Sequence, residues 1–188
     1  MRAGPDRRTA ICGAVLELLG KVGYDRMTMD AVAALARASK ATIYRLWRDK
    51  PGLVAEALVH QFQHAVEPTD TGSLRGDLLA LTGTACEYAN SADGGVVAGV
   101  ITAATRDPNL ARALRDCTYE KKRQPSETVI KRAVERGEVD AGTSASLLHE
   151  VLHSMVLARR LVDCAPLDRQ FAEHVVDDVL LPVLTRQV

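Results

Sequence analysis

Residues 39–47, with the sequence Ser-Lys-Ala-Thr-Ile-Tyr-Arg-Leu-Trp, decide how the first part of the chain folds. The stretch opens with Ser39, whose hydroxyl can accept hydrogen bonds from the first free amides of a helix. Ile43 and Trp47 lie four residues apart and are expected to pack inward together. The outward face carries Lys40, Thr42, Tyr44 and Arg45. A short helix with this division of side chains is suited to the major groove of DNA.

The residues before this stretch predict a second short helix that leads into it. Thr28 can cap its first turn, and the Asp30 carboxylate suits the positive end of the helix dipole. Only residues 36–38 separate Leu35, the last large apolar residue of that helix, from the cap at Ser39. The two helices must therefore cross at a steep angle, which predicts a helix-turn-helix motif.

Several positions around the motif are candidate DNA contacts, because residues near the start of a recognition helix reach base edges while flanking hydroxyls and cations contact phosphates. We expect Lys40, Thr42 and Arg45 to face bases. Tyr44 and Lys50 are expected to face phosphates. The full predicted set is Thr28, Arg37, Ser39, Lys40, Ala41, Thr42, Tyr44, Arg45 and Lys50. The alternative is a small helical subdomain whose Arg and Lys side chains are merely solvated.

A first helix is predicted upstream of the motif. From Thr9 to Val22 the apolar residues recur at helical spacing, which is typical of an amphipathic helix. Gly23 is placed to end this helix, since glycine adopts the left-handed backbone conformation at little cost. Tyr24 can then pack beneath the turn.

The run from Thr28 to Leu53, with the Gly23-Tyr24 ending before it, resembles the N-terminal domain of the tetracycline-repressor (TetR) family of bacterial regulators. The resemblance covers about residues 8–58. It implies an all-α fold, with a three-helix DNA-binding head at residues 1–50. It also implies a larger helical body at residues 51–188 that binds a ligand and forms a dimer.

Two residues depart from the usual pattern of that family. Arg37 stands in the turn where the family usually has glycine, so its backbone must either avoid the left-handed region or bear a modest energetic cost. Leu46 stands where the family often has histidine just before the closing aromatic residue. One phosphate contact that the resemblance implies is therefore not expected at Leu46.

The composition agrees with a helical protein that meets DNA at one end. The chain has 188 residues, of which 47% are hydrophobic and 26% charged, and only seven are aromatic, which disfavours a β-rich fold. Residues 1–60 hold ten Lys and Arg against six Asp and Glu, whereas residues 61–188 hold fourteen against eighteen. A basic head and an acidic body fit a small module that meets phosphate.

The cysteines and the hydropathy pattern favour a soluble cytoplasmic protein. No apolar run approaches the roughly 18 residues of a membrane span, and the N-terminus lacks the apolar core of a signal peptide. The four cysteines have no Cys-x-x-Cys spacing, so we expect reduced thiols rather than a zinc cluster or disulfides. The four are Cys12, Cys86, Cys117 and Cys164. The alternative is a redox sensor at Cys86 or Cys117.

The rest of the chain reads as further helices. Breaks are expected at residues 92–95, which include two glycines, and at Pro125, which must break or kink its helix. Asp107-Pro108 is a strong helix start, Gly137 an end, and Thr143 a cap. The expected helices are Leu53–Val66, Leu74–Ala89, Val96–Ala104, Pro108–Arg136, Ala145–Val162 and Asp168–Leu184.

The last two predicted helices, Ala145–Val162 and Asp168–Leu184, are apolar on more than one side. A helix of this kind needs two packing partners. One side can meet the body and the other a second copy of the chain, which agrees with the dimer that the family resemblance implies. Burial of both sides within a single subunit is the alternative.

A small-molecule pocket is expected within the body. Its candidate lining is mostly apolar with a few polar tips, which favours a largely hydrophobic effector. Neither a cofactor nor a catalytic residue is expected. The candidate lining residues are Cys86, Tyr88, Val97, Ile101, Leu114, Cys117, Tyr119, Val129, His149, His153 and Met155.

One motif points to a different class of protein. The run His149-Glu150-Val151-Leu152-His153 matches the zinc-hydrolase pattern, in which two histidines share a metal and the glutamate activates water, and Glu173 could serve as a third ligand. The simpler interpretation places these polar residues at a dimer seam or pocket wall. His60 and His64 also have metal-capable spacing but no evident third ligand.

These patterns together predict a homodimeric transcriptional regulator that binds a palindromic operator. We expect a repressor that is released by a small, mostly hydrophobic effector, although the residues do not distinguish a repressor from an activator. They also do not name the operator or the effector. The alternative is the zinc-dependent hydrolase built on His149, Glu150 and His153.

Overall fold

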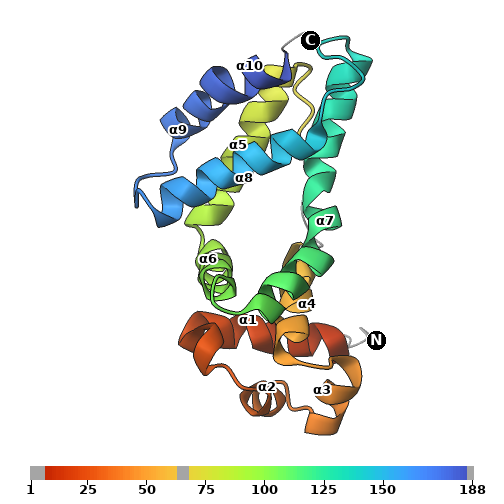
Figure 1. The fold of residues 1–188 in the computed structure, drawn as a ribbon, viewed down its shortest axis with the longest axis vertical. Helices are drawn as coiled ribbons and strands as arrows, with labels where there is room; N and C mark the ends of the chain where they lie inside the picture. Colours follow the sequence, from red (N-terminus) through yellow and green to blue (C-terminus); the bar gives the residue numbers. More distant parts are fainter. Residues whose placement is uncertain (1–6, 63–67, 186–188) are drawn as a thin grey trace, which may run out of the picture. The chain divides into compact units, whose positions relative to one another are not determined.

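The computed structural model describes residues 7–62 and 68–185, except for the side chains of residues 61–62 and 118–123 (Figure 1). All regular structure in this part of the chain is helical, which confirms the predicted all-α class. The chain divides into two compact units, one of residues 1–65 and 92–121 and the other of residues 66–91 and 122–188. The predicted domain division after residue 50 stays a prediction, because compactness alone does not define a functional domain.

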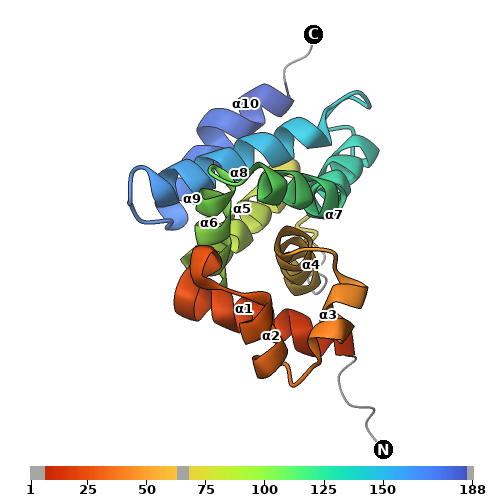
Figure 2. The ribbon, with the colours of Figure 1, turned by 60° about the horizontal axis from the view of Figure 1, so that its bottom comes forward.

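The first unit is built around helix α1 (Figures 1 and 2). Helix α1 packs against α4 and α6, and α2 bridges it to α3. The fully buried side chains that join these helices include Ile11 and Val15 of α1, Val32 of α2, and Ile43 of α3. The bounds are α1 Arg7–Arg26, α2 Met29–Leu35, α3 Lys40–Leu46, α4 Lys50–Phe62, α6 Ala92–Ala104 and the first part of α7 Pro108–Glu135.

The predicted start and stop signals of the first unit are in place. Gly23 has φ 76° and ψ 171°, so regular helical geometry stops there and the last residues of α1 form a separate turn. The Asp107 carboxylate accepts from the backbone N–H groups of Asn109 and Leu110, at 3.0 and 3.2 Å, and so caps α7. Helix α4 is described to Phe62, and its predicted extension to Val66 lies outside the described residues.

The second unit packs α5 against α8 and the C-terminal helices. Its core is almost entirely aliphatic, with Leu78, Val129, Leu152 and Val176 fully buried. One charged group is buried beside it: the Asp77 carboxylate accepts from the Thr71 hydroxyl at 2.7 Å and from the Arg136 guanidinium at 2.8 Å. The bounds are α5 Leu74–Asn90, α8 Ala145–Leu161, α9 Arg169–His174, η1 Val175–Leu180 and α10 Leu181–Leu184, with the last part of α7.

The predicted break at residues 92–95 was wrong. Residues 92–95 lie inside α6, and the chain breaks one residue earlier, at Ser91, whose hydroxyl donates to the Tyr88 carbonyl at 2.7 Å. Of the two glycines, Gly94 is buried and Gly95 is exposed. Helix α7 continues through Pro125, so the chain does not break there, and the predicted alternative of a kink stays a prediction. Ser126 and Val129, just beyond Pro125, are buried.

Two local details also differ from the expectation. The cap of α8 is Ser144 rather than Thr143, and its hydroxyl accepts from the Leu147 N–H at 3.1 Å. The last predicted helix contains a π-helical turn, in which the Leu181 N–H bonds to the Val176 carbonyl five residues back. This wider turn directly precedes Pro182, which has no N–H to continue an α-helical ladder.

No described helix is long and apolar enough to span a membrane.

Candidate nucleic-acid interface

The two helices of the predicted motif are capped as expected. The Thr28 hydroxyl accepts from the Ala31 N–H at 3.1 Å at the start of α2. The Ser39 hydroxyl accepts from the Thr42 N–H at 3.0 Å at the start of α3 and also bonds the Thr42 hydroxyl at 2.8 Å. These bonds hold Ser39 and Thr42 in fixed positions at the N-terminal end of α3, the end that enters a major groove in helix-turn-helix proteins.

Helix α3 presents the predicted polar side chains on its outer face. Ile43 is fully buried and Trp47 is 5% exposed, so both pack inward as expected. Tyr44 is 53% exposed, and Lys40, Ala41 and Arg45 are exposed as well. The structure thus brings the predicted recognition residues together on one surface. Their contact with DNA stays a prediction.

The turn between the helices places Arg37 in the left-handed region, at φ 49°. The Ala38 N–H bonds the Ala33 carbonyl at 2.9 Å and the Arg37 N–H bonds the Ala34 carbonyl at 3.3 Å, which is the hydrogen-bond pattern of a Schellman helix ending. A Schellman ending needs a left-handed residue at this position. Arg37 therefore bears the cost that glycine would avoid.

Lys40 already has an anionic partner within the protein. Its ammonium lies 2.7 Å from a carboxylate oxygen of Asp30 on α2, and both side chains are exposed. The hydrogen bond and the charge of Asp30 raise the pKa of Lys40. On DNA, a phosphate or base would therefore compete with Asp30 for the three N–H donors of the Lys40 ammonium.

A group that sequence reasoning missed holds the end of the recognition helix. The Trp47 indole N–H donates to a carboxylate oxygen of Glu56 on α4 at 2.8 Å. Arg8 of α1 donates to both oxygens of the same carboxylate at 2.9 Å, and its guanidinium lies 5.4 Å from the centroid of the Trp47 ring. Glu56 thus connects α1, α3 and α4. No short-range spacing in the sequence marked it.

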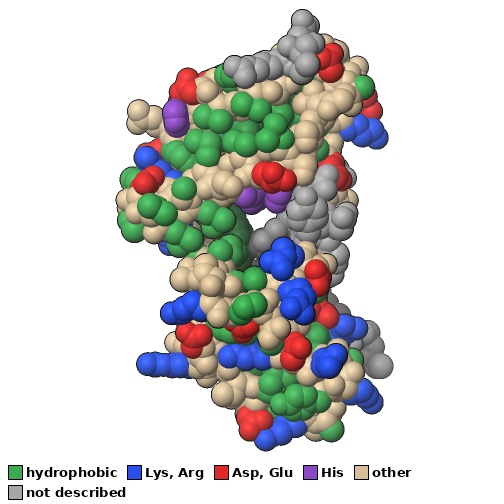
Figure 3. Space-filling view, viewed as in Figure 1, with side chains coloured by type: hydrophobic (Ala, Val, Ile, Leu, Met, Phe, Trp, Pro, Cys, Tyr) green, Lys and Arg blue, Asp and Glu red, His purple; other side chains and the backbone are tan. Residues whose placement is uncertain are grey.

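The other predicted contacts lie around this core of the motif. Thr28 is exposed at the start of α2, and Arg37 is exposed in the turn. Lys50, the first residue of α4, is half-buried, with its ammonium 4.1 Å from the centroid of the Tyr24 ring. Figure 3 shows Lys and Arg side chains interspersed with Asp and Glu over the surface of this unit.

The candidate effector residues are divided between the two units. Val97 and Val129 are buried core residues, one in each unit. The side chain of Tyr119 lies outside the described residues. The first unit holds Val97, Ile101, Leu114 and Cys117, and the second holds Cys86, Tyr88, Val129, His149, His153 and Met155. A shared binding role for these residues stays a prediction.

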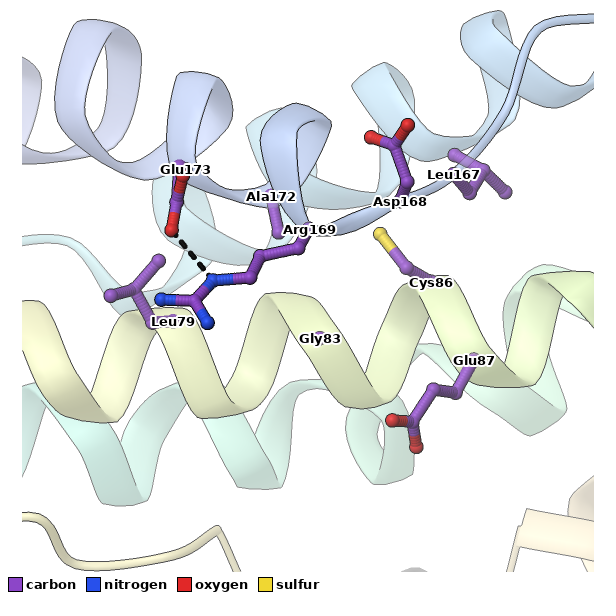
Figure 4. Close-up of a pocket in the computed structure, with 9 residues that line it drawn as sticks. All are labelled: Leu79, Gly83, Cys86, Glu87, Leu167, Asp168, Arg169, Ala172 and Glu173. Atoms are coloured by element: carbon purple, nitrogen blue, oxygen red, sulfur yellow. Dashed lines mark hydrogen bonds and ion pairs between the residues drawn. The ribbon is translucent and has the colours of Figure 1, made fainter.

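Cys86 borders a cavity of about 360 Å³ between α5 and α9 in the second unit (Figure 4). Leu79, Ala172 and Leu167 form apolar walls, and Arg169 pairs with Glu173 one turn further along α9, with 2.8 Å between the guanidinium and the carboxylate. Burial, assisted by nearby carboxylates, raises the pKa of the Cys86 thiol to about 11. A thiol with a raised pKa is less reactive, which disfavours the redox-sensor alternative at Cys86.

The zinc-hydrolase motif does not form a metal site in the described part of the chain. The rings of His149 and His153 lie 4.0 Å apart between centroids, and His153 Nδ1 is 2.8 Å from the His149 carbonyl oxygen. Glu150 accepts from the Ser146 hydroxyl at 3.1 Å, and the proposed third ligand Glu173 is paired with Arg169. No group of three or more His, Cys, Asp and Glu side chains among the described residues could hold a metal ion.

A capped recognition helix with an exposed polar face, preceded by a second short helix and a left-handed turn, defines a helix-turn-helix DNA-binding regulator. Residues 11–57 match the family described as bacterial regulatory proteins, tetR family, and residues 68–179 match the tetracyclin repressor-like C-terminal domain. The chain belongs to the TetR family of transcriptional regulators. This family is not enzymatic, so the zinc-hydrolase alternative was wrong.

Relatives that match nearly the whole chain support this family assignment. The chain is 38% identical over 182 residues to the DNA-binding transcriptional repressor TetR of Mycobacteroides abscessus, covering 96% of this chain and 95% of the relative. The crystal structure of the TetR family transcription regulator SCO0332 is 28% identical, with a TM-score of 0.76, and covers 96% of this chain and 100% of that one.

A more distant protein shares the fold. The transcriptional regulator FadR from Bacillus subtilis, solved in complex with stearoyl-CoA, is 14% identical, with a TM-score of 0.65, and covers 95% of this chain and 98% of that one. At this identity the likeness concerns the fold alone.

Proposed function

We propose that this regulator is a repressor that binds a palindromic operator as a homodimer and is released by a small, mostly hydrophobic effector. The observation that carries the DNA-binding part is the exposed polar face of α3, with Lys40, Thr42, Tyr44 and Arg45 on one surface. The caps at Thr28 and Ser39 and the bond from Trp47 to Glu56 hold that surface in place. Since it acts on chromosomal DNA, the protein works in the cytoplasm.

The dimer is supported by the apolar surface of the C-terminal helices. Figure 3 shows hydrophobic side chains gathered on one face of the second unit. Leu147 of α8 and Val183 of α10 are 40% and 39% exposed, which is high for large aliphatic side chains on helices that also supply the core. Pairing two copies through these helices gives a two-fold axis, and two-fold symmetry requires two matching DNA half-sites.

The dimer is tested by Leu147→Glu, which places a charge at this exposed position without cutting into the core. We expect the variant to sediment as a monomer under conditions in which the parent chain is a dimer. Leu35→Glu is the matched control, because Leu35 is also 40% exposed but lies on α2 of the other unit. An unchanged mass for Leu147→Glu would remove α8 from the interface.

The hydrophobic effector is supported by the apolar character of the second unit. FadR from Bacillus subtilis, which has this fold, was solved in complex with stearoyl-CoA, a ligand with a long acyl chain. The repressor activity is supported by the name of the Mycobacteroides abscessus relative. Release requires only that the effector bind more tightly to a conformation whose recognition helices no longer match the operator, because that difference in affinity sets the response.

Selection of DNA fragments from a random pool tests the DNA-binding proposal. The parent chain should enrich a palindrome whose half-site centres lie about one helical turn, or a multiple of it, apart. A chain with Thr42→Ala and Arg45→Ala should bind bulk DNA with similar affinity but lose the enriched sequence, because bases rather than phosphates are the expected partners. Absence of any enriched palindrome would contradict the proposal.

A further inference from the structure

The C-terminal end of α1 connects two elements of the first unit through a single side chain. Tyr24 is 9% exposed, and Gly23, at φ 76°, turns the chain so that its ring packs beneath the start of α4. The Lys50 ammonium lies 4.1 Å from the centroid of that ring. On the other side, the Tyr24 hydroxyl donates to Asp107 Oδ2 at 2.8 Å. Tyr24 thus contacts both the first residue of α4 and the residue that caps α7.

Asp107 is held from two directions. Its Oδ2 accepts from Tyr24, and its Oδ1 accepts from the N–H groups of Asn109 and Leu110 at 3.0 and 3.2 Å. The hydrogen bond from Tyr24 and those from the backbone hold the pKa of Asp107 below its usual range, so the carboxylate is charged at neutral pH. Asp107 therefore connects the turn between α6 and α7 to Tyr24, the side chain whose ring contacts the Lys50 ammonium.

Lys50 has little freedom at this position. Its ammonium lies 3.5 Å from the Asp25 carbonyl oxygen and over the Tyr24 ring. Burial lowers the pKa of Lys50, although the charges of Asp25 and Asp107 act in the opposite direction. An aromatic face attracts an ammonium without neutralising its charge, so Lys50 stays able to contact an anion.

We propose that Tyr24 and Asp107 are positioning residues for the Lys50 ammonium, which they hold at the start of α4 for contact with a DNA phosphate. This rests on the proposed DNA-binding function and adds a mechanism to it. A movement of the α6–α7 turn would carry Asp107 away from Tyr24 and change how the ammonium is presented. The turn would then adjust DNA affinity without touching the recognition helix.

A double-mutant cycle tests the proposal, with a fluorescently labelled 30-base-pair duplex of random sequence as the probe. A phosphate contact contributes to binding of any sequence, so the operator need not be known. Tyr24→Phe keeps the ring and removes only the hydroxyl. Asp107→Ser keeps a capping side chain for α7 but is too short to reach Tyr24. Thermal unfolding of each variant is measured alongside.

Lys50→Ala should weaken binding about threefold to tenfold and reduce the salt slope by about 1. Tyr24→Phe and Asp107→Ser should each weaken binding about twofold to threefold in the parent chain. Neither should weaken it further when Lys50 is already alanine. Lys21→Ala is the control of equal charge, since the exposed Lys21 is paired with Glu17 on α1, and it should change binding little.

Each result has a defined meaning. If Tyr24→Phe weakens the Lys50→Ala variant as much as the parent chain, the two residues act independently and the positioning role is overturned. If Lys50→Ala binds the duplex with the same affinity as the parent chain, the Lys50 ammonium contacts no phosphate and the inference also fails. Failure of the parent chain to bind the duplex at low salt would instead contradict the proposed function itself.

Discussion

Arg37 shows how one side chain can carry both a structural cost and a functional role. Its φ of 49° is required by the Schellman ending of α2, and a residue with a Cβ atom is disfavoured there by about 1 kcal/mol. The Arg7 guanidinium donates to the Arg37 carbonyl at 3.4 Å. The side chain is exposed beside the recognition helix, where a cation suits DNA.

Arg37→Gly should raise the free energy of unfolding by about 0.5–1 kcal/mol, because relief of the left-handed cost exceeds the added freedom of glycine in the unfolded chain. Urea denaturation measures it. Arg37→Ala is the control, since it keeps the strained backbone and removes only the cation. If the cation contacts phosphate, both variants should lose DNA affinity equally, and only the glycine should gain stability. If Arg37→Gly were less stable than the parent chain, the conclusion that the Arg37 backbone is strained would be wrong.

Asp30 places a negative charge on the predicted DNA surface, 2.7 Å from Lys40. Asp30→Asn should free the Lys40 ammonium and remove repulsion of phosphate, so binding to random duplex DNA should tighten by about threefold and depend more steeply on salt. Anisotropy titrations at several salt concentrations measure both effects. Glu17→Gln, which removes a carboxylate paired with Lys21 on α1, is the control of equal charge. Equal effects of the two variants would show that only net charge matters.

The position of helix α3 depends on a carboxylate that belongs to another helix. Glu56 of α4 accepts from the indole of Trp47, the residue that follows α3, and from Arg8 of α1. Burial, together with the charge of Glu56, raises the pKa of the Cys12 thiol on α1 to about 11. Loss of this group should therefore loosen the recognition helix as a whole.

Glu56→Ala should destabilise the chain by about 1–3 kcal/mol, because the buried indole N–H loses its acceptor. Glu56→Gln keeps an acceptor and should cost less. Trp47 is the only tryptophan in the chain, so its fluorescence reports directly on this site. We expect a shifted emission maximum in Glu56→Ala and weaker selection of the operator. Unchanged emission in the folded variant would show that the hydrogen bond to Glu56 does not form.

At the level of whole helices, the sequence predicted most starts and ends. Four of these signals were confirmed, because each depends on contacts within about four residues. They are the caps at Thr28 and Ser39, the end of the regular helix at Gly23 and the start of α7 at Asp107. The break at residues 92–95 was wrong, and α7 continues through Pro125, since packing of α6 and α7 outweighs the local preference of Gly and Pro.

The second unit is held together in part by a buried ion pair. Burial alone would raise the pKa of Asp77, but hydrogen bonds from Thr71 and Arg136 outweigh it and hold the pKa below its usual range. Because the folded pKa is lowered, the carboxylate stabilises the fold above the ordinary pKa of 3.8. This stabilisation is lost as the pH falls through the lowered folded pKa.

Asp77→Asn should lower the melting temperature at pH 7 and flatten the loss of stability as the pH falls below about 4, because the variant has no carboxylate to protonate there. Urea denaturation across this range gives both quantities. Asp163→Asn, a change at an exposed position, is the control and should keep the parent profile. An Asp77→Asn profile as steep as that of the parent chain would mean that other carboxylates govern the acid response.

The sequence by itself determined the helical class, the helix-turn-helix motif and the polar face of α3, because caps, helical periodicity and turn residues act over a few neighbouring positions. Only the tertiary structure decided which side chains hold that face in place. Trp47 and Glu56 are 9 residues apart, Asp77 and Arg136 are 59 apart, and Tyr24 and Asp107 are 83 apart. Partners at such separations meet only after the helices pack, and no local pattern specifies which helices do so.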